Sequence, residues 1–135
     1  MKKVACAVLA GLMLSGCVST ELTPPPTDFS GNLPEELKER FATLNDWPPE
    51  GSRGEVRTFH FDSERSLLTV IHQLRSTRWQ WRMDQSKVKP ELMDTACEQF
   101  AEAIEQGLGV RFWYTGAGGF VSDPVSRETC AANKS

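Results

Sequence analysis

Hydrophobic residues recur along the chain at helical spacing in two stretches. In residues 32–44 the stripe is Leu33, Leu37, Phe41 and Leu44, and Pro34 suits the first turn of a helix. After a loop over residues 85–89, Pro90 is expected to open a longer helix that ends near residue 106. The apolar stripe of this second helix consists of Met93, Ala96, Cys97, Phe100 and Ile104. Each helix therefore has one face to bury.

Other stretches alternate between apolar and polar residues and predict strands at 56–62, 78–84 and 110–114. The run Gly116 to Gly119 predicts a hairpin turn, because glycine readily adopts positive φ. Pro124 has no backbone N–H, so residues 120–126 are expected to form an edge strand or to contain a bulge. The tail from residue 131 to 135 is expected to be disordered.

Residues 67–74 fit both periodicities. Leu67, Val70, Ile71 and Leu74 share one side of a helix, and the same segment alternates as a strand with a β-branched centre. The pattern alone slightly favours a helix.

The start of the chain has the features of a targeting segment. Lys2 and Lys3 precede an apolar run from residue 4 to 14, which is too short to span a bilayer. The following Leu-Ser-Gly-Cys, residues 14–17, resembles the lipobox of bacterial lipoproteins. The resemblance implies cleavage after residue 16 and acylation of Cys17; the alternative is an ordinary secreted protein cut near Gly16. Cys6 would lie in the discarded segment.

The residue after Cys17 is Val18 rather than aspartate, and in lipoproteins this favours the outer membrane, facing the periplasm. Residues 17–31, with three consecutive prolines at 24–26, are expected to be an acylated tether that holds the domain off the membrane. Residues 32–135 are then a single small domain. A proline-rich ligand for another protein is the alternative interpretation of the tether.

Charge and composition exclude some classes. The 135 residues carry a formal net charge of −3, and loss of Lys2 and Lys3 changes this to −3 − 2 = −5. Nucleic-acid binding usually requires a basic patch, so no nucleic-acid partner is expected.

Cys97 lies on the apolar stripe of the long helix, and Cys130 is expected to close the last strand of the hairpin. A disulfide between them would pin that strand to the inward face of the helix and contribute roughly 3–4 kcal/mol in the chain-entropy model. Two reduced, buried cysteines are the alternative for a cytosolic protein, but the oxidising periplasm supports the bridge.

The C-terminal half resembles the AspS-type pilotin lipoproteins of type II secretion systems. The resemblance rests on the lipobox, the length of the chain and a series of features in order: Cys97 within a helix, a helix end at 104–108, Val110-Arg111 on a strand, a glycine turn, a last strand and Thr129-Cys130. It implies a single α+β domain with an antiparallel sheet of four to five strands, helices on one face and one disulfide. It also favours a strand over 67–74.

Pilotins bind a short C-terminal segment of a secretin subunit and carry it to the outer membrane, without catalysing a reaction. Such binding requires a groove with an apolar floor and a polar rim. Trp79, Trp81 and Trp113 exceed what a small core needs, so we expect some of them to line the groove. Arg78, Arg82 and Arg111 are expected to form a rim that attracts an acidic segment. The loop with Trp47 is the next candidate surface.

Catalytic and metal-binding patterns are weak. His60 and His72 lack the spacing of a metal motif, so no metal or cofactor is expected. Ser63 and Ser66 lie outside a nucleophile elbow, and the glycine run lacks the lysine of a phosphate-binding loop. A periplasmic inhibitor or immunity protein, which would present the loop from Asp46 to Glu50, remains the alternative to a pilotin.

Overall fold

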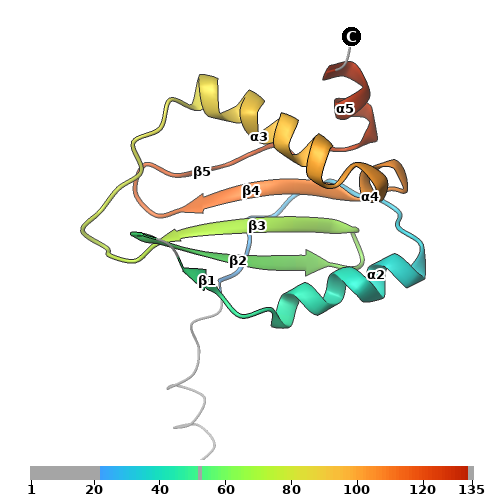
Figure 1. Ribbon diagram of the computed structural model, residues 1–135, viewed down its shortest axis with the longest axis horizontal. Coiled ribbons are helices and arrows are strands. Elements are labelled where there is room, and N and C mark those ends of the chain that lie inside the picture. Colours follow the sequence, from blue (N-terminus) through green and yellow to red (C-terminus); the bar gives the residue numbers. More distant parts are fainter. Residues whose placement is uncertain (1–21, 52, 134–135) are drawn as a thin grey trace, which may run out of the picture.

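The computed structural model describes residues 22–51 and 53–133, so Cys17 and the segment that precedes it lie outside the described residues. The chain forms one α+β domain in which helices pack on a five-stranded sheet (Figure 1). The helices are α2 (Glu35–Ala42), the 3-10 helix η1 (Thr43–Asp46), α3 (Gln85–Gln99), α4 (Ala101–Glu105) and α5 (Arg127–Asn133). The strands are β1 (Glu50–Gly51), β2 (Glu55–Asp62), β3 (Leu67–Leu74), β4 (Gly109–Thr115) and β5 (Phe120–Val121).

The strands lie in the order β1-β2-β3-β4-β5, which is also their order along the chain. Three neighbouring pairs are antiparallel, as predicted, whereas β3 and β4 are parallel. The difference arises because α3 and α4 connect these two strands: a helical crossover returns the chain to the end of the sheet at which β3 began. The α+β class with helices on one face is confirmed.

Residues 67–74 form a strand, and their position in the sheet explains the ambiguous pattern. β3 lies between β2 and β4, and the five residues from Leu67 to Ile71 are all buried. A strand that is covered on both faces has apolar residues on both sides, so its alternation is weak. The structure confirms the strand that the family resemblance favoured over the helix.

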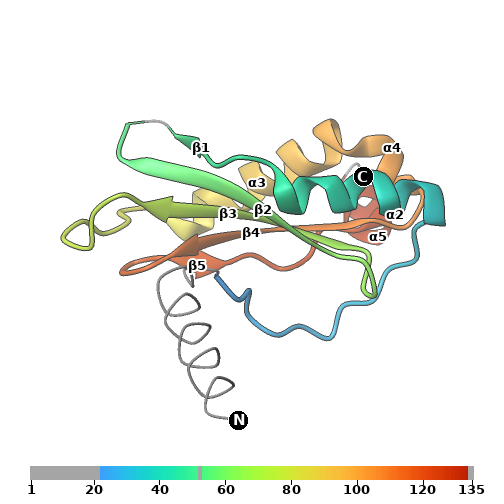
Figure 2. The same ribbon diagram turned by 90° about the horizontal axis from the view of Figure 1, so that it is seen from below.

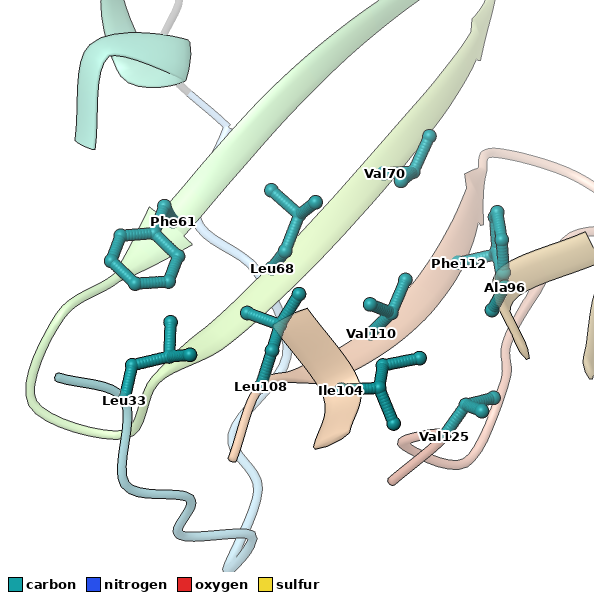
Figure 3. Packing of buried hydrophobic residues seen from close by; sticks show 10 residues of the cluster. All are labelled: Leu33, Phe61, Leu68, Val70, Ala96, Ile104, Leu108, Val110, Phe112 and Val125. Atoms are coloured by element: carbon teal, nitrogen blue, oxygen red, sulfur yellow. The ribbon is translucent and has the colours of Figure 1, made fainter. Parts of the chain in front are cut away.

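The helices α2, α3 and α4 pack on one face of the sheet (Figure 2). The side chains of this face and those of α3 and α4 point toward one another and form the hydrophobic core (Figure 3). Of the predicted stripe on the long helix, Ala96 and Ile104 are fully buried, and Met93, Cys97 and Phe100 pack around the core. The buried cluster comprises Leu33, Phe61, Leu68, Val70, Ala96, Ile104, Leu108, Val110, Phe112 and Val125.

The segment from Leu22 to Asn32 crosses the opposite face of the sheet (Figure 2). The N–H of Gly31 donates to the carbonyl of Arg65 at 2.8 Å. The ring of Phe29 packs directly on Gly109, where any Cβ atom would overlap it. Residues 22–31 therefore belong to the folded domain, in contrast to the free tether predicted from the prolines, and the domain starts about ten residues before the expected boundary.

The strand predicted over residues 78–84 is wrong. This segment has no regular structure, although the N–H of Trp81 donates to the carbonyl of Ala117 at 2.9 Å. Asp84 then caps α3, because its side chain accepts a hydrogen bond from the N–H of Ser86. The helix therefore starts at Gln85 and not at the predicted Pro90, which lies within it.

The Cys97–Cys130 disulfide is confirmed, with the two Cα atoms 5.7 Å apart. Its second end differs from the prediction, because Cys130 lies on α5 rather than on the last strand. The amide of Asn133 also donates to Asp94, at 2.6 Å, so the bridge and this bond fasten α5 to α3. The disorder predicted from residue 131 is wrong as far as Asn133, because α5 extends to that residue; residues 134–135 lie outside the described chain.

The predicted hairpin between β4 and β5 is present. Gly116 and Gly118 have φ values of 94° and 77°, which glycine adopts without strain. β5 is an edge strand as expected, and beyond it Val125 forms an isolated bridge with Val110. In the part of the chain that is described, no helix is long and apolar enough to cross a membrane.

Candidate functional site

A groove of about 620 Å³ lies between α2 and the junction of α3 with α4. Both sides of the groove are built on the same face of the sheet, so its position is fixed by the hydrophobic core beneath it. One side is lined by Leu37, Arg40, Phe41 and Leu44, and the other by residues 98–103 together with Gln106.

The floor of the groove is apolar. Its half-buried side chains pack on the core from both sides, and they are Leu37, Phe41, Leu44, Phe100 and Ala103. The ring of Phe41 lies 5.7 Å from that of Phe61 and 6.5 Å from that of Phe100. Phe41 therefore joins the floor to the sheet, and its exposed part can contact a ligand.

The groove opens where the crossover helix is interrupted. Phe100 has φ −116° and ψ 26°, which ends α3 and caps the short helix α4. The backbone remains bonded across this break, because the N–H of Ile104 donates to the carbonyl of Phe100 at 2.8 Å. The interruption turns Phe100 toward α2 and leaves the small side chains of Ala101 and Ala103 along the groove.

The rim of the groove is polar and asymmetric in charge. Arg40 lies on the α2 side, and Glu98 and Glu102 lie on the opposite side. All three side chains are exposed, as are Gln99 and Gln106. An apolar floor between a cationic and an anionic edge suits an amphipathic segment with charges on both flanks.

The structure does not bring the three predicted tryptophans together. Trp79 lies in the loop after β3 and is 51% exposed. Trp81 is half-buried: its indole N–H donates to the carbonyl of Thr115 at 2.7 Å, and its ring meets Tyr114 edge-on at 5.0 Å. Trp113 is half-buried on β4 beside Val121, on the face opposite Phe112 and the helices. They therefore do not form the floor of one groove.

The predicted arginine rim is also divided. Arg78 and Arg82 are exposed, and with Trp79 and Gln80 they line a shallow hollow of about 350 Å³. Arg111 is only 4% exposed, so it is not a rim residue. It points to the far face of the sheet because Val110 and Phe112 on either side of it face the core.

Arg111 is held under the N-terminal segment. Its Nε donates to Oγ1 of Thr69 at 3.0 Å, and its Nη2 donates to the carbonyl of Pro25 at 2.7 Å. Burial lowers the pKa of the Arg111 guanidinium, nearby Arg65 lowers it further, and Asp62 acts in the opposite direction. Alternation alone could not identify this role, because the covering segment was read as a spacer.

A second hollow, of about 830 Å³, lies on the far side of β2 beside the loop with Trp47. Trp47 is 52% exposed and lines it together with Pro48 and Pro49. Leu22, Val56, Thr58 and His60 contribute to its opposite wall. The loop with Trp47 was the next candidate for a partner-binding surface after Trp79, Trp81 and Trp113.

The two histidines lie on opposite faces of the sheet and do not form a joint site. Nδ1 of His72 lies 2.8 Å from Oε2 of Glu55, and the His72 ring stacks on Tyr114 at 4.5 Å. Burial raises the pKa of the Tyr114 hydroxyl, and the charge of Glu55 raises it further. Within residues 22–51 and 53–133, no cluster of three or more His, Cys, Asp or Glu side chains is arranged to hold a metal ion.

Sequence analysis missed the groove because each of its residues had an ordinary structural interpretation. Leu37, Phe41 and Phe100 belong to apolar helix stripes that were expected to be buried. The partial exposure of the stripes depends on the break at Phe100, which no glycine or proline marks. The pair of alanines at 101 and 103 beside Phe100 is the one local signal of a shallow surface there.

Comparisons with known proteins add no identification: no protein-family model, curated protein or solved structure matches the chain.

Proposed function

We propose that this chain is a lipid-anchored outer-membrane protein that binds an amphipathic segment of a secretin subunit and carries it to the outer membrane. The groove between α2 and the α3–α4 junction carries the proposal. Its apolar floor and charged rim match the mode in which a helix places its apolar face into a hydrophobic groove. Binding and delivery require no chemical step, so the proposed protein is not an enzyme.

The lipobox supports the delivery part of this function. Cys17 follows the short apolar segment and the Leu-Ser-Gly sequence that in lipoproteins precede the acylated cysteine. Several acyl chains on one residue bind a bilayer far more firmly than a single chain. A protein anchored in this way can bind a subunit and keep it at the membrane surface.

The rim also changes the expected chemistry of the partner. The predicted arginine rim called for an acidic segment, but Arg111 is buried and the groove has Glu98 and Glu102 on one edge. The segment proposed here is an amphipathic helix with basic side chains toward Glu98 and Glu102. Arg40 on the other edge would form an ion pair with an acidic side chain of the segment. Charges placed this way fix the direction of a bound helix.

Direct binding tests the proposal. A labelled peptide with the C-terminal sequence of the secretin from the same genome is titrated with the protein, and fluorescence anisotropy gives Kd. Ala101 is exposed on the groove wall, so Ala101→Trp should fill the groove without entering the core. We expect this variant to weaken binding roughly 30-fold, the loss typical of a blocked anchor site.

Ala131→Trp is the matched control, because Ala131 is an exposed alanine on α5 away from the groove. It should bind the peptide like the wild type. Glu98→Gln with Glu102→Gln should weaken binding more at low salt than at high salt, since exposed charges are screened. Equal Kd values for the Ala101 and Ala131 variants would place the partner elsewhere.

An inhibitor or immunity protein is the second candidate, and the exposure of Trp47 favours it. The indole stands in a loop stiffened by Pro48 and Pro49, beside a hollow of about 830 Å³. A rigid aromatic loop is suited to insertion into the active site of another protein. Trp47→Ala should abolish binding of such a target and leave peptide binding in the helical groove unchanged.

A further inference from the structure

The folded N-terminal segment limits how far the domain can lie from its proposed anchor. This inference rests on the lipid anchor in the proposed function, but not on the secretin. Leu22 lines the hollow on the far side of β2, so it is fixed to the domain. Cys17 precedes Leu22 by 22 − 17 = 5 residues, and five residues span at most about 18 Å even when fully extended. An acylated Cys17 would therefore hold this end of the domain close to the bilayer.

The loop that contains Trp79 lies at the same end of the sheet. Leu22 and Val56 line the same hollow, and Gly54, two residues before Val56, is in contact with Trp79. A Cβ atom at Gly54 would lie 3.1 Å from Cζ3 of Trp79. In both ribbon views the loop after β3 and the start of the described chain lie toward the same end of the sheet (Figures 1 and 2).

This loop differs in chemistry from the rest of the chain. Trp79 is one of two tryptophans that are more than half exposed, and the exposed side chains of Arg78 and Arg82 surround it in one shallow hollow. The whole chain has a formal net charge of −3, so cationic side chains gather here against the overall balance. Tryptophan favours the headgroup level of a membrane, and each arginine near an anionic surface adds to the attraction.

We propose that the loop over residues 78–82 binds anionic phospholipid headgroups of the leaflet that holds the anchor. Trp79 inserts its ring at the interface, and Arg78 and Arg82 contact lipid phosphates. The contact orients the domain on the bilayer, with the far face of the sheet and the segment from Leu22 toward the lipid. The groove between α2 and α3–α4 then opens on the other side of the sheet, away from the membrane.

The test uses the mature chain, residues 17–135 with Cys17→Ser, held on vesicles by an N-terminal histidine tag and a nickel-chelating lipid. The vesicles contain brominated phosphatidylcholine alone or with phosphatidylglycerol, and bromine quenches tryptophans that reach the interface. Quenching should increase when phosphatidylglycerol is present. Trp79→Phe should remove about half or more of this increase, because Trp79 is the inserted ring.

Arg78→Gln with Arg82→Gln keeps Trp79 but removes both charges. This double variant should lower the ratio of docked to undocked loop roughly 30-fold on phosphatidylglycerol vesicles. Arg127→Gln is the control, because Arg127 is an exposed arginine on α5, which lies away from the loop after β3 (Figure 1), and it should leave the increase unchanged.

Quenching that is independent of phosphatidylglycerol, or that survives Trp79→Phe, would overturn the proposal. It would indicate that the loop serves a protein partner instead. The tag replaces the native lipid, so the result does not depend on acylation. Mass analysis of the N-terminal peptide of the native protein reports separately on the anchor, and the peptide titration reports on the secretin.

Discussion

Arg111→Met tests whether the N-terminal segment is held in place by the buried guanidinium. The substitution keeps a long apolar side chain but removes the donors to Thr69 and Pro25, at 3.0 and 2.7 Å. Methionine also has no charge to bury. The domain should still fold, because the core on the other face of the sheet is untouched.

The magnitude follows from two opposing contributions. Hydrogen bonds from a charged donor contribute roughly 1.5–3 kcal/mol each, so two bonds contribute about 3–6 kcal/mol. Burying a charge without an opposite charge costs several kcal/mol, and the methionine variant avoids part of that cost. We expect a net loss of about 2–3 kcal/mol for Arg111→Met. Thr69→Val removes only the bond from Nε and leaves the guanidinium bonded to the carbonyl of Pro25, so it should lose about 1.5–3 kcal/mol.

Urea unfolding measures the free energy, and hydrogen exchange locates the effect. The amides of Gly31 and Asn32 donate to the carbonyls of Arg65 and Gly107, so their exchange reports on docking of the segment. Relative to the wild type, Arg111→Met should accelerate the exchange of these two amides more than it accelerates the exchange of the β3 amides. Unchanged stability, or loss of protection that is uniform over the domain, would refute the role of Arg111 as the fastener of this segment.

Three further predictions concern the bridge, the single tyrosine and the anchor. Cys97→Ala and Cys130→Ala should each cost roughly 3–4 kcal/mol in urea unfolding, and the double variant about the same, because the bridge spans 33 residues and is lost in all three. Burial raises the pKa of Tyr114 in the folded protein. The contribution of Tyr114 to the free energy of unfolding is therefore complete below the pKa of tyrosine in the unfolded chain, about 10, and is lost as pH rises through the folded pKa. Stability should therefore fall in alkaline solution, and Tyr114→Phe should reduce the fall; a tyrosinate absorbance titration with a midpoint near that of a free tyrosine would contradict the shift. Cys17→Ser should leave the protein soluble or uncleaved in cell fractionation, and recovery of this variant with the outer membrane would contradict the lipoprotein assignment.

The regular elements with strong amphipathic patterns were predictable from the sequence. The stripe through Ala96, Cys97 and Ile104 faces the core as expected, and the disulfide forms from that position. The alternation of Val110, Phe112 and Tyr114 likewise gives a strand with these residues toward the helices. In each case the local pattern and the tertiary packing favour the same structure.

The sequence was misleading where tertiary contacts override a local pattern. Residues 78–84 alternate as a strand would, but Trp81 instead bonds to the β4–β5 hairpin through Ala117 and Thr115. The start of α3 depends on the cap at Asp84, whereas Pro90 gave the stronger signal in the sequence. The partners of Trp81 lie more than 25 residues away along the chain, which local periodicity does not encode, whereas the cap of Asp84 on Ser86 is local and was outweighed by the proline signal.

The candidate site was less predictable than the fold. Arg78, Arg82 and Arg111 each occupy a polar position in an alternating segment, but Arg111 alone is covered by the segment from Leu22 to Asn32. The groove depends on the distance between α2 and α4 and on the break at Phe100. Such distances are set by packing between elements, so hydrophobic periodicity in one element cannot reveal them.

The parallel pairing of β3 with β4 has a consequence for the order in which the chain folds. Leu67 pairs with Gly109, so 109 − 67 = 42 residues separate partners at the centre of the sheet. β1, β2 and β3 can associate through short turns, but the centre is complete only after the crossover helices are in place. Cys130 follows both, near the end of the chain. If the chain is exported as proposed, with the N-terminus emerging first, an oxidant of the periplasm can join Cys97 to Cys130 only after Cys130 has emerged. Formation of the disulfide is then the closing event, and it traps a sheet that is already assembled.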